Sequence, residues 1–148
     1  QHLTALRGLH LRDNDVESGG CKAVGAWLLH LTALETLGLS RNRLGVEGGR
    51  ALAASLQHLT GLQTLDLAHN ALAKAGVEAL VAPLQRLAAL QTLTLDMNGL
   101  DHDFCTELGA TFPHVQDIST QLGLRSDVGR CDSTRGLGVS NGAAERPW

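Results

Sequence analysis

Residues 34–42 have the sequence Leu34-Glu-Thr-Leu37-Gly-Leu39-Ser-Arg-Asn42, and this pattern returns along the chain at a constant spacing. The four copies occupy residues 6–14, 34–42, 62–70 and 90–98. Successive copies begin 28 residues apart, and Leu or Asn fills all sixteen template positions. Self-similarity at a fixed period of this length is the signature of a protein built from stacked structural repeats.

The remainder of each period also keeps register, and it predicts a helix. Apolar residues follow each template Asn at intervals of 10, 14 and 17 residues. Because these intervals differ by four and three, the residues form one stripe of an amphipathic helix. The alternating Leu-x-Leu segment predicts a strand of about three residues. Each period should therefore form a strand, a turn at the Asn and a helix running back, and neighbouring periods must stack to bury their apolar stripes.

This pattern resembles the leucine-rich repeat, and its length together with a full helix resembles the ribonuclease-inhibitor-like subclass. That subclass also occurs in nucleotide-binding immune receptors and in Ran GTPase-activating proteins. The resemblance implies an α/β fold, a solenoid shaped as a horseshoe arc with parallel strands on the concave face and helices on the convex face. We expect this repeat domain to occupy residues 1–124, as about four full repeats and a degraded fifth.

The pattern weakens toward the end of the chain. Val115 and Ile118 keep the register of the period, whereas Leu122 and Leu124 come one residue late. Residues 125–148 form a tail that contains Gly and Arg but few aliphatic residues, so we expect it to be disordered. Because the sequence opens inside a repeat without an initiating Met, we expect it to be part of a longer protein.

Composition excludes several classes of function. Leu supplies 29 of the 148 residues and aromatic residues only 3%, which predicts an aliphatic core. The net charge of -3 argues against electrostatic nucleic-acid binding. No apolar run approaches the roughly 18 residues of a membrane span, so no membrane association is expected. The three cysteines are irregularly spaced, which favours reduced thiols and a cytoplasmic location.

Some polar residues recur in columns, and most of these columns have structural explanations. We interpret Asn14, Asn42, Asn70 and Asn98 as a structural ladder whose amides bond backbone groups at the strand ends. A second column holds His2, His30, His58, Arg86 and His114. A metal site is not expected there, because each His lies on a different repeat and Arg86 interrupts the series. We predict no catalytic residues, no cofactor and no small-molecule substrate.

The positions beside the template leucines vary from repeat to repeat, as on an adaptable binding surface, although a merely solvated face would also vary. Arg12 and Arg41 lie toward one end of this face, and Asp66 and Asp96 toward the other, which predicts a partner with a complementary charge gradient. Trp27, on the helix of the first repeat, is expected to be packed at a former repeat interface and not to be a free anchor for a partner. The candidate partner-binding residues are Arg12, Asp13, Arg41, Asp66, His69, Thr94, Asp96 and Met97.

The leading hypothesis is a non-enzymatic module that binds a folded protein partner through the concave face. The identity of that partner cannot be read from the residues. The family resemblance implies two alternatives, a regulator of a small GTPase and the sensor region of a nucleotide-binding immune receptor. A structural scaffold within a larger assembly is a further hypothesis.

Overall fold

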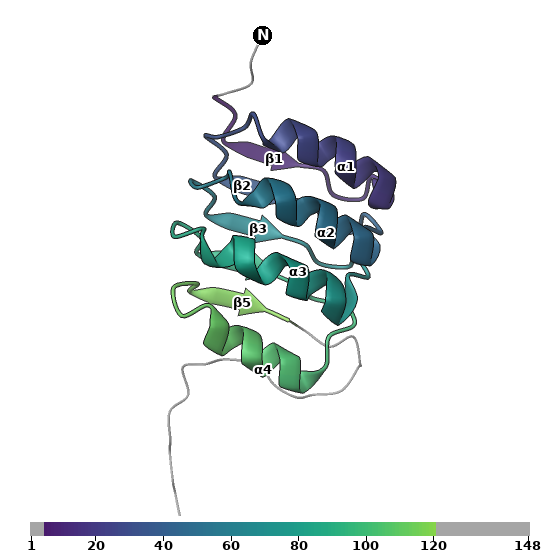
Figure 1. Cartoon of the computed structure of the whole chain (residues 1–148), viewed down its shortest axis with the longest axis vertical. Coiled ribbons are helices and arrows are strands. Elements are labelled where there is room, and N and C mark those ends of the chain that lie inside the picture. The colour runs from purple at the N-terminus through teal and green to yellow at the C-terminus, as the bar shows by residue number, and fades with distance from the viewer. Residues whose placement is uncertain (1–4, 121–148) are drawn as a thin grey trace, which may run out of the picture.

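Strands and helices alternate along the chain in this computed structural model, which describes residues 5–120 (Figure 1). The strands are β1 (Gly8–His10), β2 (Thr36–Gly38), β3 (Thr64–Asp66), β4 (Thr92–Thr94) and β5 (Asp117–Ser119). The helices are α1 (Glu17–Leu28), α2 (Gly45–Leu56), α3 (Ala73–Gln85) and α4 (His102–Thr111). Each period thus forms one strand, one turn and one helix, as the sequence predicts.

The five strands form one parallel sheet in chain order, so the α/β solenoid expected from the repeat is confirmed. Leu37 pairs with Leu65, and Leu65 pairs with Leu93, which places each residue opposite its equivalent 28 residues away. The helices lie along one side of this sheet, where α1 packs against α2 and α2 against α3 (Figure 1). The other side, which we call the sheet face, carries no helix of the described residues.

The core lies between the sheet and the helices and consists almost entirely of leucine. Leu65 and Leu93 are fully buried, whereas the residues on either side of each are half-buried at the sheet face. Burying a leucine side chain contributes about 1.5–3 kcal/mol, and every repeat buries several of them. A rigid sheet face is the consequence, because its strands are fixed from behind by the core.

The helices end earlier than the apolar stripe predicts. Helix α1 ends at Leu28, so the third stripe position, Leu31, lies beyond it. Leu31 is nevertheless buried, and its N–H donates to the carbonyl of Leu28 at 3.0 Å. A three-residue turn of this kind continues the helical rotation more tightly, which explains why helical spacing extends past the helix end.

The fifth period differs from the predicted register. Ile118 pairs with Leu93, only 25 residues away, so Ile118 takes the second leucine position and not the first. Helix α4 has 10 residues, compared with 12 or 13 in the other helices. Helix α4 ends at Thr111, 13 residues after Asn98, whereas α1 and α2 end 14 residues after their asparagines. Five residues, 112–116, then lead to β5, compared with the seven residues 29–35 between α1 and β2, so the chain reaches β5 three residues sooner. Leu122, Leu124 and the tail expected from residue 125 onward lie outside the described residues.

Glycine allows neighbouring helices to approach closely. A Cβ added at Gly49 of α2 would lie 2.8 Å from the carbonyl oxygen of Gly76 in α3. Such a contact is too short for any real side chain, so this helix pair requires glycine at that point. No helix of the described part is long and apolar enough to cross a membrane.

Two of the cysteines also lie on the helices. Cys21 and Cys105 are both buried as free thiols, and Cys131 lies beyond the described range. The Cys21 thiol lies against the carbonyl oxygen of Gly48, at 3.3 Å. Burial raises the pKa of Cys21 to about 11, so this thiol stays protonated at neutral pH.

Candidate functional site

The asparagine after the strand closes the turn by bonding backbone groups of two repeats in the second, third and fourth repeats. The Asn70 amide nitrogen donates to the carbonyl of Leu67 in its own repeat at 3.0 Å and to that of Leu39 in the preceding repeat at 2.9 Å. Its carbonyl oxygen accepts the backbone N–H of Asn42 at 2.9 Å. The amides of Asn42, Asn70 and Asn98 are buried and hydrogen-bonded to the backbone, so they hold the turns in place and are not available to a ligand.

The same contacts recur along the solenoid but weaken at its first repeat. The backbone N–H of Asn70 donates to the Asn98 oxygen at 3.1 Å, and that of Asn14 donates to the Asn42 oxygen at 3.0 Å. Asn14 itself is exposed, and its amide nitrogen bonds only the carbonyl of Arg12, at 3.0 Å. The ladder therefore stabilises the inner repeats more than the first.

The residue before each asparagine has a left-handed backbone. The φ values of Asp13, Arg41, His69 and Met97 lie between 56° and 58°. This conformation costs roughly 1–2 kcal/mol for a residue with a side chain, so it persists only where the surrounding structure holds it. All four side chains are exposed, and all four are candidate residues from the sequence. No glycine marks these positions, which is why the sequence did not reveal the backbone strain.

The structure brings six of the eight candidate residues together around one open depression of about 250 Å³ on the sheet face. The candidate residues that line it are Arg12, Arg41, Asp66, His69, Thr94 and Asp96. Ser40 and Ala68, which sequence reasoning did not select, line the same depression and are only 4% and 8% exposed. Like Arg12 and Asp96, these two residues lie two positions before a template asparagine, so their place in the repeat could have identified them as lining residues.

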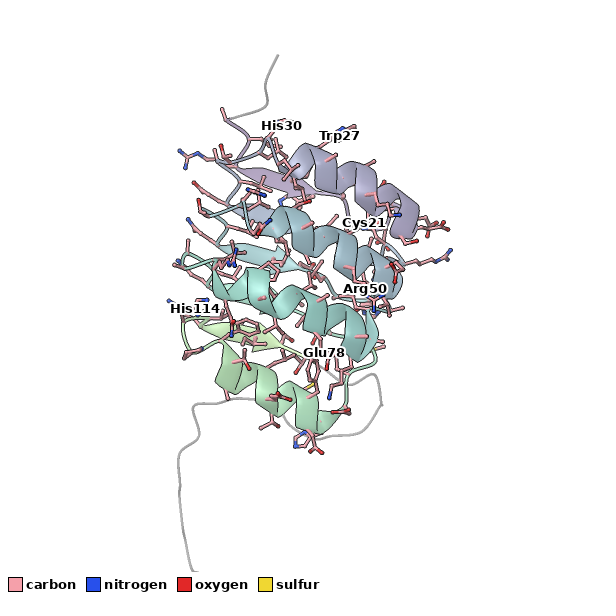
Figure 2. The ribbon with its side chains drawn as sticks, viewed as in Figure 1. Cys21, Trp27, His30, Arg50, Glu78 and His114 are labelled. Carbon is pink, nitrogen blue, oxygen red and sulfur yellow. The ribbon has the colours of Figure 1, made fainter. Side chains whose placement is uncertain are left out.

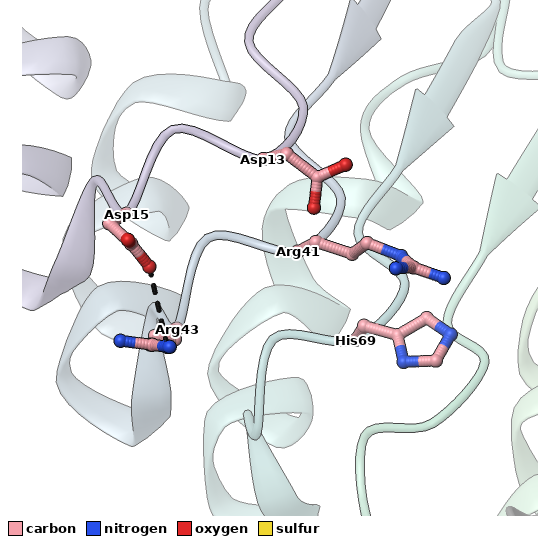
Figure 3. Close-up of a pocket in the computed structure, with 5 residues that line it drawn as sticks. All are labelled: Asp13, Asp15, Arg41, Arg43 and His69. Carbon is pink, nitrogen blue, oxygen red and sulfur yellow. Dashed lines mark ion pairs between the residues drawn. The ribbon is translucent and has the colours of Figure 1, made fainter.

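A second depression, of about 410 Å³, adjoins the first and shares Arg41 and His69 with it (Figure 3). Asp13 lines this second depression, together with Asp15 and Arg43, which the sequence analysis missed. Arg43 and Asp15 form an exposed ion pair at 3.3 Å. Of the candidate residues only Met97 lines neither depression, and its side chain is 41% exposed.

Charges are distributed unevenly over the first depression. Arg12 and Arg41 follow β1 and β2, and Arg12 pairs with Asp13 at 3.3 Å. The carboxylates come from the next two repeats, and both accept hydrogen bonds within the protein. Asp66 accepts the backbone N–H of Ala68 at 3.0 Å. Asp96 accepts the hydroxyl of Ser119 at 2.7 and 2.8 Å.

The histidine column and Trp27 lie away from this surface. His30 and His58 follow the ends of their helices, and residues 5–120 contain no group of three His, Cys, Asp or Glu side chains that could hold a metal ion. The expectation that Trp27 is packed is wrong, because it is 72% exposed on the edge of α1 that faces away from α2 (Figure 2).

The exposure of Trp27 has a structural reason. Ser55, the equivalent residue in α2, lies so close to α1 that a Cβ on Gly25 would be 2.8 Å from its hydroxyl. This position therefore faces the preceding helix. Because no described helix precedes α1, Trp27 has no neighbour there.

Comparisons with known proteins support the repeat architecture. A family model described as Leucine Rich repeat matches residues 1–25, 30–53 and 57–81, together half of the chain. The fold is similar to a tropomodulin C-terminal domain from Caenorhabditis elegans, with a TM-score of 0.70 and 11% identity over 84% of this chain and 78% of that chain. It is also similar to leiomodin-1 actin-binding site 2, with a TM-score of 0.70 and 14% identity over 83% and 75% of the two chains. No curated protein matches the sequence.

Proposed function

Because this chain belongs to the leucine-rich repeat family, we propose that it is a protein-interaction module that binds a folded partner against its sheet face, the concave face of the repeat array. One observation carries the proposal. Six of the eight candidate residues, which we selected because their positions vary between repeats, are distant in sequence. These six line one open depression on that face. A surface of this kind provides polar contacts from several repeats at once, on a support that the leucine core keeps rigid.

The chemistry of the depression favours recognition over catalysis. Asp66 and Asp96 are held by the donors Ala68 N–H and Ser119 hydroxyl, which fixes the carboxylates in place. Groups held in this way suit a complementary partner surface, where charge distribution sets orientation and association rate. We therefore propose a binding role without enzymatic activity. A cytoplasmic location is part of the proposal, supported by the buried free thiols of Cys21 and Cys105.

A pair of charge swaps tests this function. The double variant Arg41→Glu and Asp66→Arg exchanges the charges of two neighbouring repeats on the sheet face, which removes the charge gradient without changing the net charge. The control double variant Arg50→Glu and Glu78→Arg makes the same exchange on the helices α2 and α3 (Figure 2). Both control residues are exposed and form only surface ion pairs. The control loses only these surface pairs, each worth about 1 kcal/mol or less. The sheet-face variant loses the hydrogen bond from the Ala68 N–H to Asp66, worth about 0.5–1.5 kcal/mol, so both double variants should fold.

The measurement compares the proteins that the immobilised chain retains from a cell extract, followed by association kinetics with each purified protein so identified. We expect the sheet-face swap to weaken binding at least tenfold and the helix swap to leave it unchanged. Equal binding by the sheet-face swap, or equal loss in the helix swap, would show that partners do not bind through the sheet face.

A further inference from the structure

We propose that Ser40, Arg41 and His69 form a subsite for a side-chain carboxylate of the partner protein. This inference rests on the proposed function and adds the chemistry of one contact. The three residues line the same depression at the ends of β2 and β3. All three carry hydrogen-bond donors, and none of these donors has an acceptor within the described part of the chain.

Ser40 provides the buried member of this set. The residue is 4% exposed, and its hydroxyl oxygen is buried without a hydrogen-bond partner among the described residues. Buried hydroxyl groups in folded proteins are normally bonded, so a group left without a partner requires an explanation. The fold itself does not need this hydroxyl, because the next repeat has Ala68 at the equivalent position, also buried. Because this oxygen has almost no accessible surface in the unbound chain, a partner's acceptor bonds it only after the Ser40 side chain rotates toward the depression that the residue lines.

Arg41 provides the charge. Many of the basic side chains in residues 5–120 are paired with a carboxylate; these are Arg7, Arg12, Arg43, Arg50 and Lys74. Arg41 has no such pair, although it lies beside Ser40 in the sequence and over the same depression. Its guanidinium and the His69 ring extend in the same direction from successive turns (Figure 3). A guanidinium presents two parallel N–H groups, which match the two oxygens of a carboxylate.

The remaining groups of the depression decide the class of ligand. The acceptors Asp66 and Asp96 already receive internal hydrogen bonds, so the unused groups are donors and the missing partner is an acceptor. The formal charges of Arg12, Arg41, Asp66 and Asp96 around the depression cancel, so a second negative charge on the ligand gains no net attraction and costs more to remove from water. A singly charged carboxylate therefore fits better than a phosphate. The open shape of the depression suits an Asp or Glu side chain that projects from a protein surface.

Acetate is the probe for this subsite, because it reproduces the side-chain carboxylate without the rest of the partner. The full chain, labelled with ¹⁵N, is titrated with sodium acetate at constant ionic strength while the backbone and guanidinium signals of Arg41 are followed by NMR. We expect saturable shifts with acetate, none with the neutral analogue acetamide, and weaker binding of inorganic phosphate. Non-saturable shifts, equal shifts with acetamide, or tighter binding of phosphate would overturn the proposal.

Three variants assign the effect to named groups. Arg41→Gln should weaken acetate binding about tenfold or more, because it removes a charge-assisted pair of hydrogen bonds. Ser40→Ala should weaken it about fivefold, the effect of one net hydrogen bond, without loss of folding. Arg50→Gln on α2 makes the same charge change away from the sheet face and should have no effect. An effect of Arg50→Gln equal to that of Arg41→Gln, or none of Ser40→Ala, would contradict the subsite.

The two experiments separate this inference from the proposed function. If the sheet-face charge swap abolishes partner binding but acetate does not bind, the subsite is wrong and the interaction surface stands. If acetate binds at Arg41 but partners bind the swapped variant normally, the proposed function is wrong.

Discussion

Replacing Asn70 by alanine tests how the turns are held. Asn70 is fully buried, and its amide nitrogen donates to the carbonyls of Leu39, Leu67 and Ala68 at 2.9, 3.0 and 3.2 Å. Its oxygen accepts the N–H of Asn42 at 2.9 Å. The variant removes all four contacts and leaves the backbone groups of two adjacent repeats in place.

The cost follows from which of these groups keep another partner. The carbonyl of Leu39 still receives the Asn42 amide, and that of Ala68 still receives the N–H of Arg41. The backbone N–H of Asn42 has no second acceptor among the described residues, so it becomes a buried donor without a partner. Such a group costs about 1–3 kcal/mol, and the weakened carbonyls add roughly another 1 kcal/mol. We expect Asn70→Ala to lower the free energy of unfolding by about 2–4 kcal/mol.

Asn14→Ala is the matched control, because the same substitution is made where the ladder begins. Asn14 is exposed and its side chain donates one hydrogen bond, to the carbonyl of Arg12, so the loss should stay below about 1 kcal/mol. Urea unfolding of both variants, followed by circular dichroism, gives the two free energies at unchanged slope. A loss for Asn70→Ala no larger than that for Asn14→Ala would refute the assignment of these amides to the turns.

Three further outcomes concern stability. Ser40→Ala should raise the free energy of unfolding by up to about 1 kcal/mol, because it removes a buried hydroxyl without a partner, and urea unfolding measures it. Gly45→Ala should lower the free energy of unfolding by roughly 1 kcal/mol, because φ is 62° there and no atom would contact the new Cβ. Ala73 is the equivalent residue of the next repeat, with φ of 52°, so Ala73→Gly should raise the free energy of unfolding in the same assay. Because burial raises the pKa of Cys21 from 9.0 to about 11, the stability due to this thiol is complete below pH 9 and is lost as pH rises toward 11. Unfolding measured against pH should show that decline, and a Cys21→Ala variant should lack it.

The sheet was predictable because the 28-residue repeat indicates which residues pair between neighbouring strands. Leu37, Leu65 and Leu93 occupy the same template position, and parallel pairing of identical positions is the only arrangement that buries all of them together. The prediction failed where the spacing changed. Ile118 kept the 28-residue interval in the sequence, yet α4 ends one residue earlier than α1 and α2 do, and its connection to β5 is two residues shorter than that from α1 to β2. The repeat period can be counted in the sequence, whereas the lengths of the last helix and of its connection to β5 are seen only in the structure.

The exposed residues of the candidate surface were predictable from the sequence, whereas the buried residues that line the depression were not. Arg41 and His69 stood out because they vary within a repeating frame. Ser40 and Ala68 vary in the same way, but their burial depends on how the left-handed turn places them, and no glycine marks that turn. Trp27 was misjudged because its environment depends on a neighbouring helix.

The most direct test of the sheet face as the interaction surface is site-specific photo-crosslinking. A benzophenone amino acid replaces Met97, which is exposed beside the depressions but lines neither, so the surface itself stays intact. The control carries the same group at Ala54, an exposed position on α2. If partners bind the sheet face, illumination in a cell extract should give covalent protein adducts from position 97 and not from position 54. Adducts formed only at position 54, or equally at both, would contradict it.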